Sequence, residues 1–241
     1  MKLEQIIYPM TLDKFFIEHY NKKHFVIRGF KDKWDRLYSW DKFNDFMNGY
    51  PKNCGSLQII DPVKNVDRWC LDKSRKAKRP LIKKQDLFNM WKNNKSFVLP
   101  IQETQSEYMN LICKCFEKYW EQGQANIYCS PGGGSKSFPA HVDQTDNFLF
   151  HVEGDIKWTM YKEFAPEDNV AKNVLEELYL ENGDLLYIPK YQFHKAESMS
   201  PRISISIHFS DKKDQDIKNF KITPFKESKR DDWYNWKVWE K

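Results

Sequence analysis

The sequence contains no long hydrophobic run and no paired-cysteine motif, and these absences speak against several classes of protein. No apolar stretch approaches the roughly 18–20 residues of a bilayer-spanning helix, and the first residues lack the apolar segment of a secretory signal. We therefore expect a cytoplasmic protein without a membrane partner. The five cysteines are an odd number without a Cys-x-x-Cys pair, so we expect reduced, mostly buried thiols rather than disulfides or a zinc ribbon.

The composition is that of a folded globular protein. Of 241 residues, 40% are hydrophobic, 16% aromatic and 30% charged. A chain of this size buries ~70% of its extended surface, which suits one large domain. The net charge of +5 is too small to demand a nucleic-acid partner. Segment 73–84 holds seven Lys or Arg residues, and we interpret it as a solvated loop that leaves RNA binding open.

Residue periodicity predicts helices in the first half of the chain and short strands in the second. Thr11 is expected to cap a helix with apolar residues at intervals of three and four, followed by a strand over 24–28 and a helix from Ser39. The clearest amphipathic helix is expected over 108–119. Further strands are predicted over 56–60, 96–101, 125–130, 146–153, 156–161, 175–180, 184–188 and 202–209.

The spacing of these strands predicts a mainly β fold in which an antiparallel sheet closes as a sandwich or barrel. We expect a helical and strand wrap over 1–124 that is integral to the barrel, a barrel core over 125–210, and a charged, Trp-rich tail over 211–241. Asn182-Gly183 predicts a two-residue hairpin between the flanking strands. The tail is expected to pack on the body or on a second subunit, which leaves a homodimer open.

A candidate metal site combines His141, Asp143 and His194. An imidazole and a carboxylate two residues apart in an extended segment point to the same face. The pair alone is weak evidence, because six histidines and 34 acidic residues give ~0.8 such matches by chance, and His151-Val152-Glu153 is a second one. His141 follows a turn-rich segment and His194 follows a hydrophobic strand, as expected for a barrel rim. Two histidines and one carboxylate form the facial triad that suits Fe(II).

Three other candidate sites receive less support. The glycine-rich segment 130–137 resembles a phosphate-binding loop, but Ser135 stands where the loop needs glycine, and no strand–loop–helix unit surrounds it. His151 and His208 are expected to be hydrogen-bonded pocket residues, because this is the commoner role of a lone inward histidine. With six histidines and no suitable context, a hydrolytic triad has little support.

Four stretches of the chain carry sequence motifs: Ala125–Gly134, His141–Trp158, Gly183–Pro189 with His194, and Ile203–Phe209. In these stretches, and more faintly in Phe15–Gly29, the sequence resembles the JmjC/cupin-like 2-oxoglutarate oxygenases, especially the ribosomal-protein hydroxylase type. The resemblance implies a double-stranded β-helix, with Fe(II), 2-oxoglutarate and O2 as cofactor and cosubstrates. It further implies hydroxylation of an unactivated carbon, with release of succinate and carbon dioxide.

The same resemblance assigns roles to individual residues. It makes His141, Asp143 and His194 the iron ligands, and an Asp in this set is more similar to the hydroxylases than to the lysine demethylases. It also places Tyr128 and Asn147 at positions that reach the cosubstrate. Asn147 shares the parity of the first two ligands along the predicted strand.

One position departs from the family pattern. This branch carries Lys or Arg two residues before the Trp that follows the hairpin, where the present chain has Ile156. Lys157 is one position off and is expected to face the other way. The last strand alternates polar and apolar residues, so Arg202, Ser204 and His208 share a face that we expect to line the pocket. Arg202 is then either a substitute partner for the far carboxylate of 2-oxoglutarate or the partner of a surface acid.

The function expected from these observations is hydroxylation of a protein side chain by an Fe(II)- and 2-oxoglutarate-dependent dioxygenase, with a ribosomal protein as the substrate by family analogy. Two alternatives stay open. One is a hydroxylase of RNA or a small molecule, for which the basic segment 73–84 would contact phosphates. The other is a cupin-like metal-binding or interaction module that performs no oxidation, which Ile156 keeps open.

Overall fold

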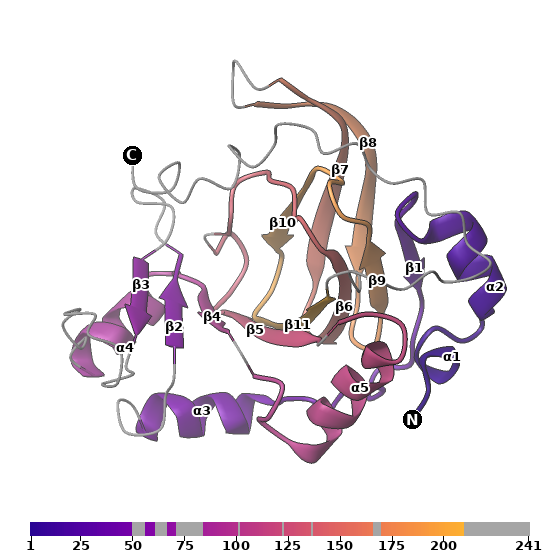
Figure 1. The fold of residues 1–241 in the computed structure, drawn as a ribbon. Helices are drawn as coiled ribbons and strands as arrows, with labels where there is room; N and C mark the ends of the chain where they lie inside the picture. Colours follow the sequence, from indigo (N-terminus) through magenta and orange to yellow (C-terminus); the bar gives the residue numbers. More distant parts are fainter. Residues whose placement is uncertain are drawn as a thin grey trace.

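A computed structural model of the chain describes residues 1–49, 56–60, 67–70, 84–100, 102–121, 123–135, 137–165 and 170–209. Two β-sheets of unequal size face each other, and helices α3 (Trp40–Gly49) and α5 (Glu107–Glu117) lie on the outer side of the larger sheet (Figure 1). The Trp-rich tail and the basic segment 73–84, apart from Lys84, fall outside the described residues. The predictions made for them therefore stay predictions.

The larger sheet contains eight of the described strands, in the order β1-β9-β6-β11-β5-β4-β2-β3, and every neighbouring pair is antiparallel. The strands are β1 (Phe25–Ile27), β2 (Ser56–Ile59), β3 (Asp67–Cys70), β4 (Phe97–Leu99), β5 (Gln124–Ser130), β6 (Asp146–Glu153), β9 (Leu185–Ile188) and β11 (Arg202–Phe209). The predicted strands of this sheet are confirmed to within one or two residues, and β3 is an addition.

The smaller sheet has the order β10-β7-β8, with β10 (His194–Ser198), β7 (Ile156–Ala165) and β8 (Val170–Leu180). An isolated antiparallel bridge between His141 and His194 adds one more chain segment beside β10. From β6 onward the chain crosses from one sheet to the other at four places: between β6 and β7, β8 and β9, β9 and β10, and β10 and β11. This repeated crossing closes the two sheets around a common interior.

The Asn182-Gly183 hairpin prediction is wrong. The chain does turn there, and Asp184 N donates to Glu181 O at 3.1 Å. However, β8 pairs with β7 in the smaller sheet, whereas β9 pairs with β1 and β6 in the larger one. The turn at Gly154 likewise joins β6 to β7 in different sheets. An Asn-Gly pair specifies a tight reversal of the chain, but the sheet that each flanking strand enters depends on distant residues.

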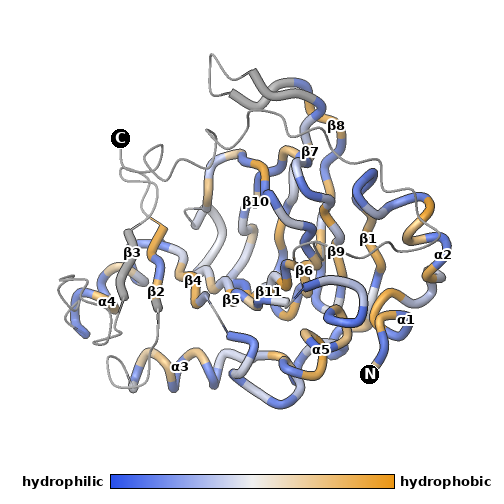
Figure 2. The backbone as a smooth tube through the Cα atoms, in the orientation of Figure 1, coloured by the Kyte–Doolittle hydropathy of each residue, from blue (hydrophilic) through white to orange (hydrophobic). Residues whose placement is uncertain are grey.

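The helices occupy the first half of the chain, as predicted. They are α1 (Leu3–Ile6), α2 (Leu12–Lys14) with the π-helical turn η1 (Phe15–His19), α3, α4 (Lys84–Lys92) and α5. Thr11 caps α2, because its hydroxyl accepts from Lys14 N, and Ser106 caps α5 in the same way. Hydrophobic and hydrophilic residues alternate along α3 and α5, as in amphipathic helices that cover a sheet (Figure 2).

Two apolar cores lie on opposite faces of the larger sheet. The main core joins that sheet to the helices and includes the apolar face of β11, namely Ile203, Ile205, Ile207 and Phe209. The second core lies between the sheets and consists of Leu149, Ile156, Trp158, Met160, Leu180, Leu186 and Ile188. The polar face of β11 therefore points toward the smaller sheet, into the interior. This is the orientation that the alternation of residues 202–209 predicted.

Cys113, Cys115 and Cys129 are buried free thiols, which confirms the cysteine prediction for these three. Burial raises the pKa of the Cys113 thiol to about 12. Among the described residues, the helices are all too short or too polar to span a bilayer.

Candidate metal centre

The backbone holds His141, Asp143 and His194 together at one edge of the smaller sheet. His141 N donates to His194 O at 3.0 Å, and His194 N returns a bond of 2.9 Å to His141 O. Tyr191 N donates to Asp143 O at 2.8 Å. His141 and Asp143 precede β6 rather than lying within it, whereas His194 is the first residue of β10. Segments about fifty residues apart in the sequence are thereby fixed side by side.

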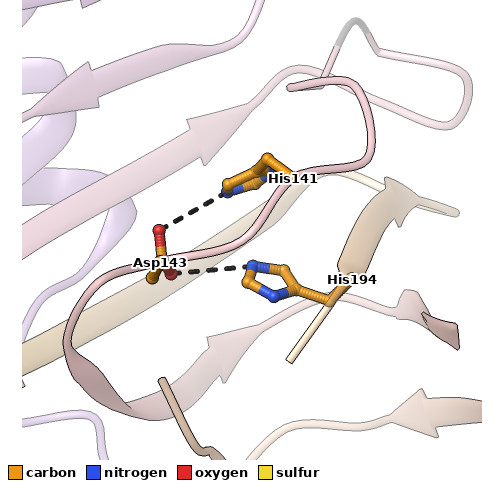
Figure 3. Close-up of side chains that lie close together, drawn as sticks. All are labelled: His141, Asp143 and His194. Carbon is orange, nitrogen blue, oxygen red and sulfur yellow. Dashed lines mark ion pairs between the residues drawn. The ribbon is translucent and has the colours of Figure 1, made fainter. Parts of the chain in front are cut away.

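The three side chains converge on one point (Figure 3). His141 Nε2 lies 3.7 Å from Asp143 Oδ1, and His194 Nε2 lies 3.6 Å from Asp143 Oδ2. One ligand atom from each residue lies within 4.8 Å of the others, and the group that the described residues form here has only these three members. His194 is buried, while the other two are partly exposed.

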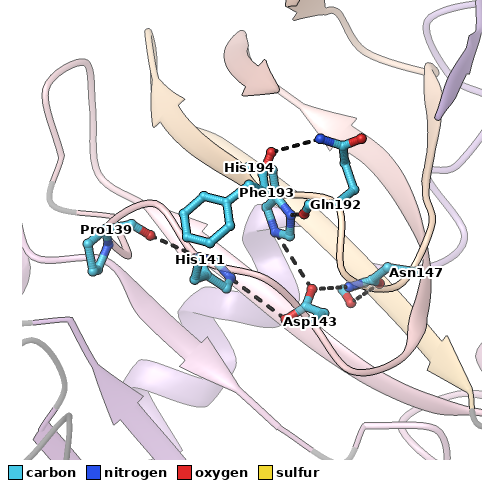
Figure 4. A network of polar contacts seen from close by, with 8 residues as sticks. Pro139, His141, Asp143, Asn147, Gln192, Phe193 and His194 are labelled. Carbon is cyan, nitrogen blue, oxygen red and sulfur yellow. Dashed lines mark hydrogen bonds and ion pairs between the residues drawn. The ribbon is translucent and has the colours of Figure 1, made fainter. Parts of the chain in front are cut away.

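Hydrogen bonds to backbone carbonyls set the tautomers of both imidazoles. His141 Nδ1 lies 2.9 Å from Pro139 O, and His194 Nδ1 lies 2.8 Å from Gln192 O (Figure 4). A carbonyl oxygen only accepts, so each Nδ1 carries the proton and donates it. In the neutral form of each ring, Nε2 then presents a lone pair toward Asp143. Such carbonyl or carboxylate partners behind the ring are typical of metal-ligating histidines.

The charges of the group also suit metal binding. Burial alone raises the pKa of Asp143, but His141, His194 and the hydrogen bond from Asn147 outweigh it and hold the pKa below its ordinary value of 3.8. Burial, with a further contribution from His141, lowers the pKa of His194 from 6.5 to about 4. At neutral pH the carboxylate is therefore ionised and the buried imidazole is neutral, which are the forms that bind a metal ion.

The donor set fits a first-row divalent ion. Two imidazoles and one carboxylate suit Fe(II) and leave coordination positions open. Bonds of about 2.0–2.2 Å at right angles would place neighbouring donor atoms ~3 Å apart, and the two imidazole nitrogens lie 3.7 and 3.6 Å from the carboxylate oxygens of Asp143. The prediction that the three side chains converge is confirmed.

Asn147 contacts the group directly. Its Nδ2 donates to Asp143 Oδ2 at 3.0 Å, and its Oδ1 accepts from Ser206 Oγ at 2.5 Å. These two bonds fix the orientation of the amide, because only the nitrogen donates to the carboxylate and only the oxygen accepts from the hydroxyl. Asn147 thus links the polar face of β11 to the carboxylate of Asp143.

Arg202 and Ser204 lie deeper in the interior, as part of a second polar cluster. The Arg202 guanidinium donates from Nε to Ser130 Oγ at 3.1 Å and from Nη1 to Ser204 Oγ at 3.2 Å. Ser130 shares a further hydrogen bond of 2.8 Å with Ser96. Burial lowers the pKa of Arg202 from 12.5 to about 10, so it stays charged at neutral pH. The alternative that Arg202 pairs with a surface acid is not what the described residues show, since its side chain is buried and contacts serines.

His151 is a hydrogen-bonded pocket residue, as predicted. Its Nε2 donates to Gly154 O at 2.7 Å, so its Nδ1 accepts from Ser204 Oγ at 2.9 Å. Both ring nitrogens are thereby used, and burial lowers the pKa to about 4. The second His-x-acid match is therefore not a metal pair.

Two predicted pocket residues lie on strands of the larger sheet, and the charge of one of them, His208, interacts with Asp143. His208 lies partly exposed at the end of β11, and its Nε2 is 3.2 Å from Gln124 Oε1. Tyr128 is half-buried on β5 opposite Ser204, beside the second cluster rather than the triad. The assignment of both to cosubstrate binding stays a prediction.

Sequence reasoning missed two interior serines, Ser130 and Ser198. Ser130 lies beside Arg202 because β5 pairs with β11 in a register that puts the two residues opposite each other. Ser198 belongs to β10, a strand that was not predicted, and lies opposite Ile156 of β7. The alternation of residues along β5 puts Ser130 on the same face as Tyr128, and this pattern could have identified Ser130 from the sequence. The position of Ser198 depends on pairing between distant segments and could not.

Comparison with known proteins agrees with this arrangement. Residues 97–217, about half of the chain, match the JmjC domain family. Over 223 residues the chain is 26% identical to the bifunctional lysine-specific demethylase and histidyl-hydroxylase NO66 of Dictyostelium discoideum and 25% identical to ribosomal oxygenase 2 of Rattus norvegicus. These alignments cover 86% of this chain but 42% and 46% of the two relatives, so the chain spans less than half of their length.

A solved structure is similar over most of the chain as well. The structure of YcfD, a ribosomal oxygenase from Escherichia coli, in complex with cobalt and 2-oxoglutarate superposes with a TM-score of 0.59 at 16% identity. The match covers 85% of this chain and 52% of that one. A likeness at this identity shows the fold, and it confirms the predicted mainly β, JmjC cupin-type architecture with its helical wrap.

Proposed function

The chain belongs to the JmjC domain family, and on that premise we propose that it is an Fe(II)- and 2-oxoglutarate-dependent dioxygenase that hydroxylates a side chain of a protein substrate. The observation that carries the proposal is the convergence of His141, Asp143 and His194, with no fourth such donor in the group that the described residues form. A closed structural site uses four protein ligands, whereas three leave room for a cosubstrate and O2.

Bound Fe(II) would supply the centre at which 2-oxoglutarate and O2 react to give succinate, carbon dioxide and a hydroxylated carbon. The chain's own residues hold the ligands for it. Pro139 O and Gln192 O keep each Nδ1 protonated, and Asn147 orients the Asp143 carboxylate. The Trp158 ring packs near the buried His194 imidazole, with ring centroids 5.6 Å apart.

A ribosomal protein is the substrate that we propose first. Support comes from the relatives, of which one carries the name histidyl-hydroxylase and others the name ribosomal oxygenase. The RNA alternative relied on the basic segment 73–84, of which only Lys84 is described. Lys84 begins α4 and donates from Nζ to Asn48 O at 2.7 Å. The described contacts therefore add nothing in favour of RNA.

The proposal is tested by incubating the purified protein with Fe(II), ascorbate and 2-oxoglutarate under air, with and without a mixture of ribosomal proteins. We expect succinate release that increases with substrate, and a substrate peptide heavier by one oxygen atom in mass spectrometry. His141→Ala should abolish both signals. Lys157→Met is the matched control, because Lys157 points outward to Glu177 and Glu197.

The alternatives give different results in the same assay. Oxidation of an added RNA, but of no protein, would replace the protein substrate by RNA. A protein that binds Fe(II) through the triad and yet neither binds 2-oxoglutarate nor releases succinate would be a non-oxidising metal-binding module. That outcome would overturn the proposed activity.

A further inference from the structure

The hairpin formed by β7 and β8 extends past the end of β10. β10 pairs with β7 only as far as Met160, which lies opposite His194. The pairing of β7 with β8 continues beyond this point, and both strands run on past the end of β10 (Figure 1). We call this part of the hairpin, residues 161–165 and 170–175, the arm. Among the described residues the arm has only two strands, and a two-stranded ribbon has little stability in water unless a further strand or a packed face supports it.

One edge of the arm offers backbone groups to a further strand. Tyr161 N donates to Phe193 O at 2.9 Å, and Tyr161 O accepts from Gln192 Nε2 at 2.9 Å, so both backbone groups of Tyr161 point to the side of β10. In an antiparallel ladder, alternate residues of a strand direct both backbone groups to the same neighbour. Glu163 therefore directs its N–H and C=O to this same edge. Neither group has a partner among the described residues, because β10 has already ended.

The second strand of the arm adds exposed apolar side chains. Val174 lies opposite Tyr161, and directly opposed residues of antiparallel strands share a face. Val174 is 52% exposed, and its neighbour Leu175 is 46% exposed. Natural proteins usually cover or charge a free strand edge, because such an edge is a template for pairing with another chain. An open backbone edge beside exposed apolar side chains is the kind of surface that receives an extended polypeptide.

The open edge leads to the candidate metal centre. Glu163 is three residues beyond Met160, which corresponds to roughly 10 Å along the strand. Because Met160 lies opposite His194, a strand docked at Glu163 would continue the row of β10 just beyond the point where His194 begins it. At about 3.3–3.6 Å per residue, three to five residues of extended chain span the distance from this edge to the three candidate ligands.

We propose that the edge of β7 at Glu163 is a docking strand for the substrate polypeptide, which pairs with it in an extended conformation and thereby brings a side chain to the metal centre. The chemistry of the edge identifies the partner, because a peptide backbone presents N–H and C=O groups at the spacing of a β ladder and a nucleic acid does not. The oxidised residue should lie about three to five residues from the paired segment. The inference rests on the proposed function, because it assigns the docking of the substrate of that site.

Amide hydrogen exchange tests the docking strand without any mutation. The ¹⁵N-labelled protein is loaded with Zn(II), which is redox-inert, so that substrate binds without being oxidised. Exchange is followed by NMR with and without an unlabelled mixture of ribosomal proteins. We expect the Glu163 amide to exchange rapidly in the protein alone and about 10-fold or more slowly with the mixture. The amide of Lys162 points toward β8 and should change less.

Two variants at one position separate the backbone donor from the side chain. Glu163→Pro removes the N–H, and proline is tolerated on an edge strand where that group faces solvent. For the protein that is oxidised in the ribosomal mixture, Glu163→Pro should raise the KM by about 3–10-fold, the range for one hydrogen bond. Glu163→Ala keeps the N–H and should raise the KM less. Lys157→Met, on the outer face of the same strand, is the control that should match the parent.

The possible failures are distinguishable. A ribosomal protein that is oxidised but does not slow exchange at Glu163, or an equal KM for Glu163→Pro and Glu163→Ala, would overturn the docking strand and leave the oxygenase function intact. Slow exchange at Glu163 in the protein alone would also overturn it, because another segment of the chain or a second copy would then fill the edge. If Glu163→Pro does not fold, the exchange measurement on the parent decides. Failure to oxidise any protein would overturn the proposed function instead.

Discussion

At the residue scale, hydrogen-bond partners decide which of two similar motifs is available to bind a metal ion. His141 and His151 are each followed two residues later by a carboxylic acid. His141 uses only Nδ1 in a hydrogen bond and keeps Nε2 toward Asp143, whereas His151 uses both nitrogens. The sequence identified both matches and preferred the first from its context. The partners that separate them come from distant strands and are not visible in the motif.

This difference predicts how the two histidines respond to substitution. His141→Ala should reduce the affinity for Fe(II) or Zn(II) by more than about 100-fold, because loss of a ligand exceeds the loss of an outer partner. Asn147→Ala removes such an outer partner and should cost about 10-fold. His151→Gln should retain parental affinity. Metal content after dialysis against graded chelator concentrations measures all three, and a His151→Gln protein that loses its metal would contradict the assignment.

Burial of His151 predicts a specific pH dependence of stability. Its pKa falls from 6.5 in the unfolded chain to about 4 in the folded protein. Between these values the unfolded state takes up a proton that the folded state does not, so the free energy of unfolding decreases as the pH falls from 6.5 to 4. The total effect is at most about 3 kcal/mol.

Urea unfolding of the parent and of His151→Gln at intervals from pH 7 to pH 4 tests this. The His151→Gln protein lacks the titrating imidazole, so its free energy of unfolding should fall less steeply as the pH decreases. The difference in free energy of unfolding between the parent and the variant should therefore shrink from pH 6.5 to pH 4. Contributions of the other histidines are common to both proteins and cancel in the difference. Parallel curves would show that His151 titrates normally in the folded state.

At the scale of elements, the sequence predicted strands with strong periodicity and failed where pairing alone makes a strand. β11 was predicted with its exact bounds because polar and apolar residues alternate along it. β10, with the sequence His-Lys-Ala-Glu-Ser, has little intrinsic strand propensity and is defined by its register with β7. The hairpin error has the same origin, since local turn chemistry does not reveal which sheet the next strand joins.

The turn between β8 and β9 depends on a glycine that no other residue replaces without strain. Gly183 has φ of +93°, and a Cβ built there would lie 2.0 Å from Phe30 O. Gly183→Ala should therefore destabilise the fold by more than about 2 kcal/mol, from backbone strain and steric overlap together.

Gly134 provides the matched control for this prediction. Its φ is +70°, but a Cβ there would meet nothing within 4 Å. Gly134→Ala should cost only about 1 kcal/mol, the backbone strain alone. Thermal unfolding of both variants measures the contrast. Equal losses would mean that the contact with Phe30 O relaxes at little cost.

At the scale of the whole molecule, the larger sheet separates the main apolar core from an interior that holds both polar side chains and the second apolar core. The helices pack on one face, and the other face carries Asn147, His151 and the polar residues of β11. The sequence predicted the fold class from strand periodicity, and it predicted the convergence of His141, Asp143 and His194 from motifs that resemble those of a known family. It did not predict that Ser130 lies beside Arg202 or that Ser198 lies opposite Ile156, because both positions depend on long-range register.

The candidate metal centre connects the two sheets, and this predicts that a bound ion stabilises the whole fold. His141 and Asp143 lie on the segment that leads into β6 of the larger sheet, while His194 begins β10 of the smaller one. An ion that binds the folded chain but not the unfolded one stabilises it by about 2.7 kcal/mol at one hundred times its dissociation constant. For a domain of this size, that corresponds to a rise in Tm of roughly 5–10 °C.

Thermal unfolding with Zn(II), with excess chelator and with neither measures this effect. The parent and Lys157→Met should both gain stability with Zn(II) and lose it with chelator. His141→Ala should show the same Tm in all three conditions, because the ion then has too few ligands to bridge the sheets. A Tm rise of equal size in His141→Ala would place the stabilising ion elsewhere on the protein and would remove the triad as the point where the two sheets are joined by metal.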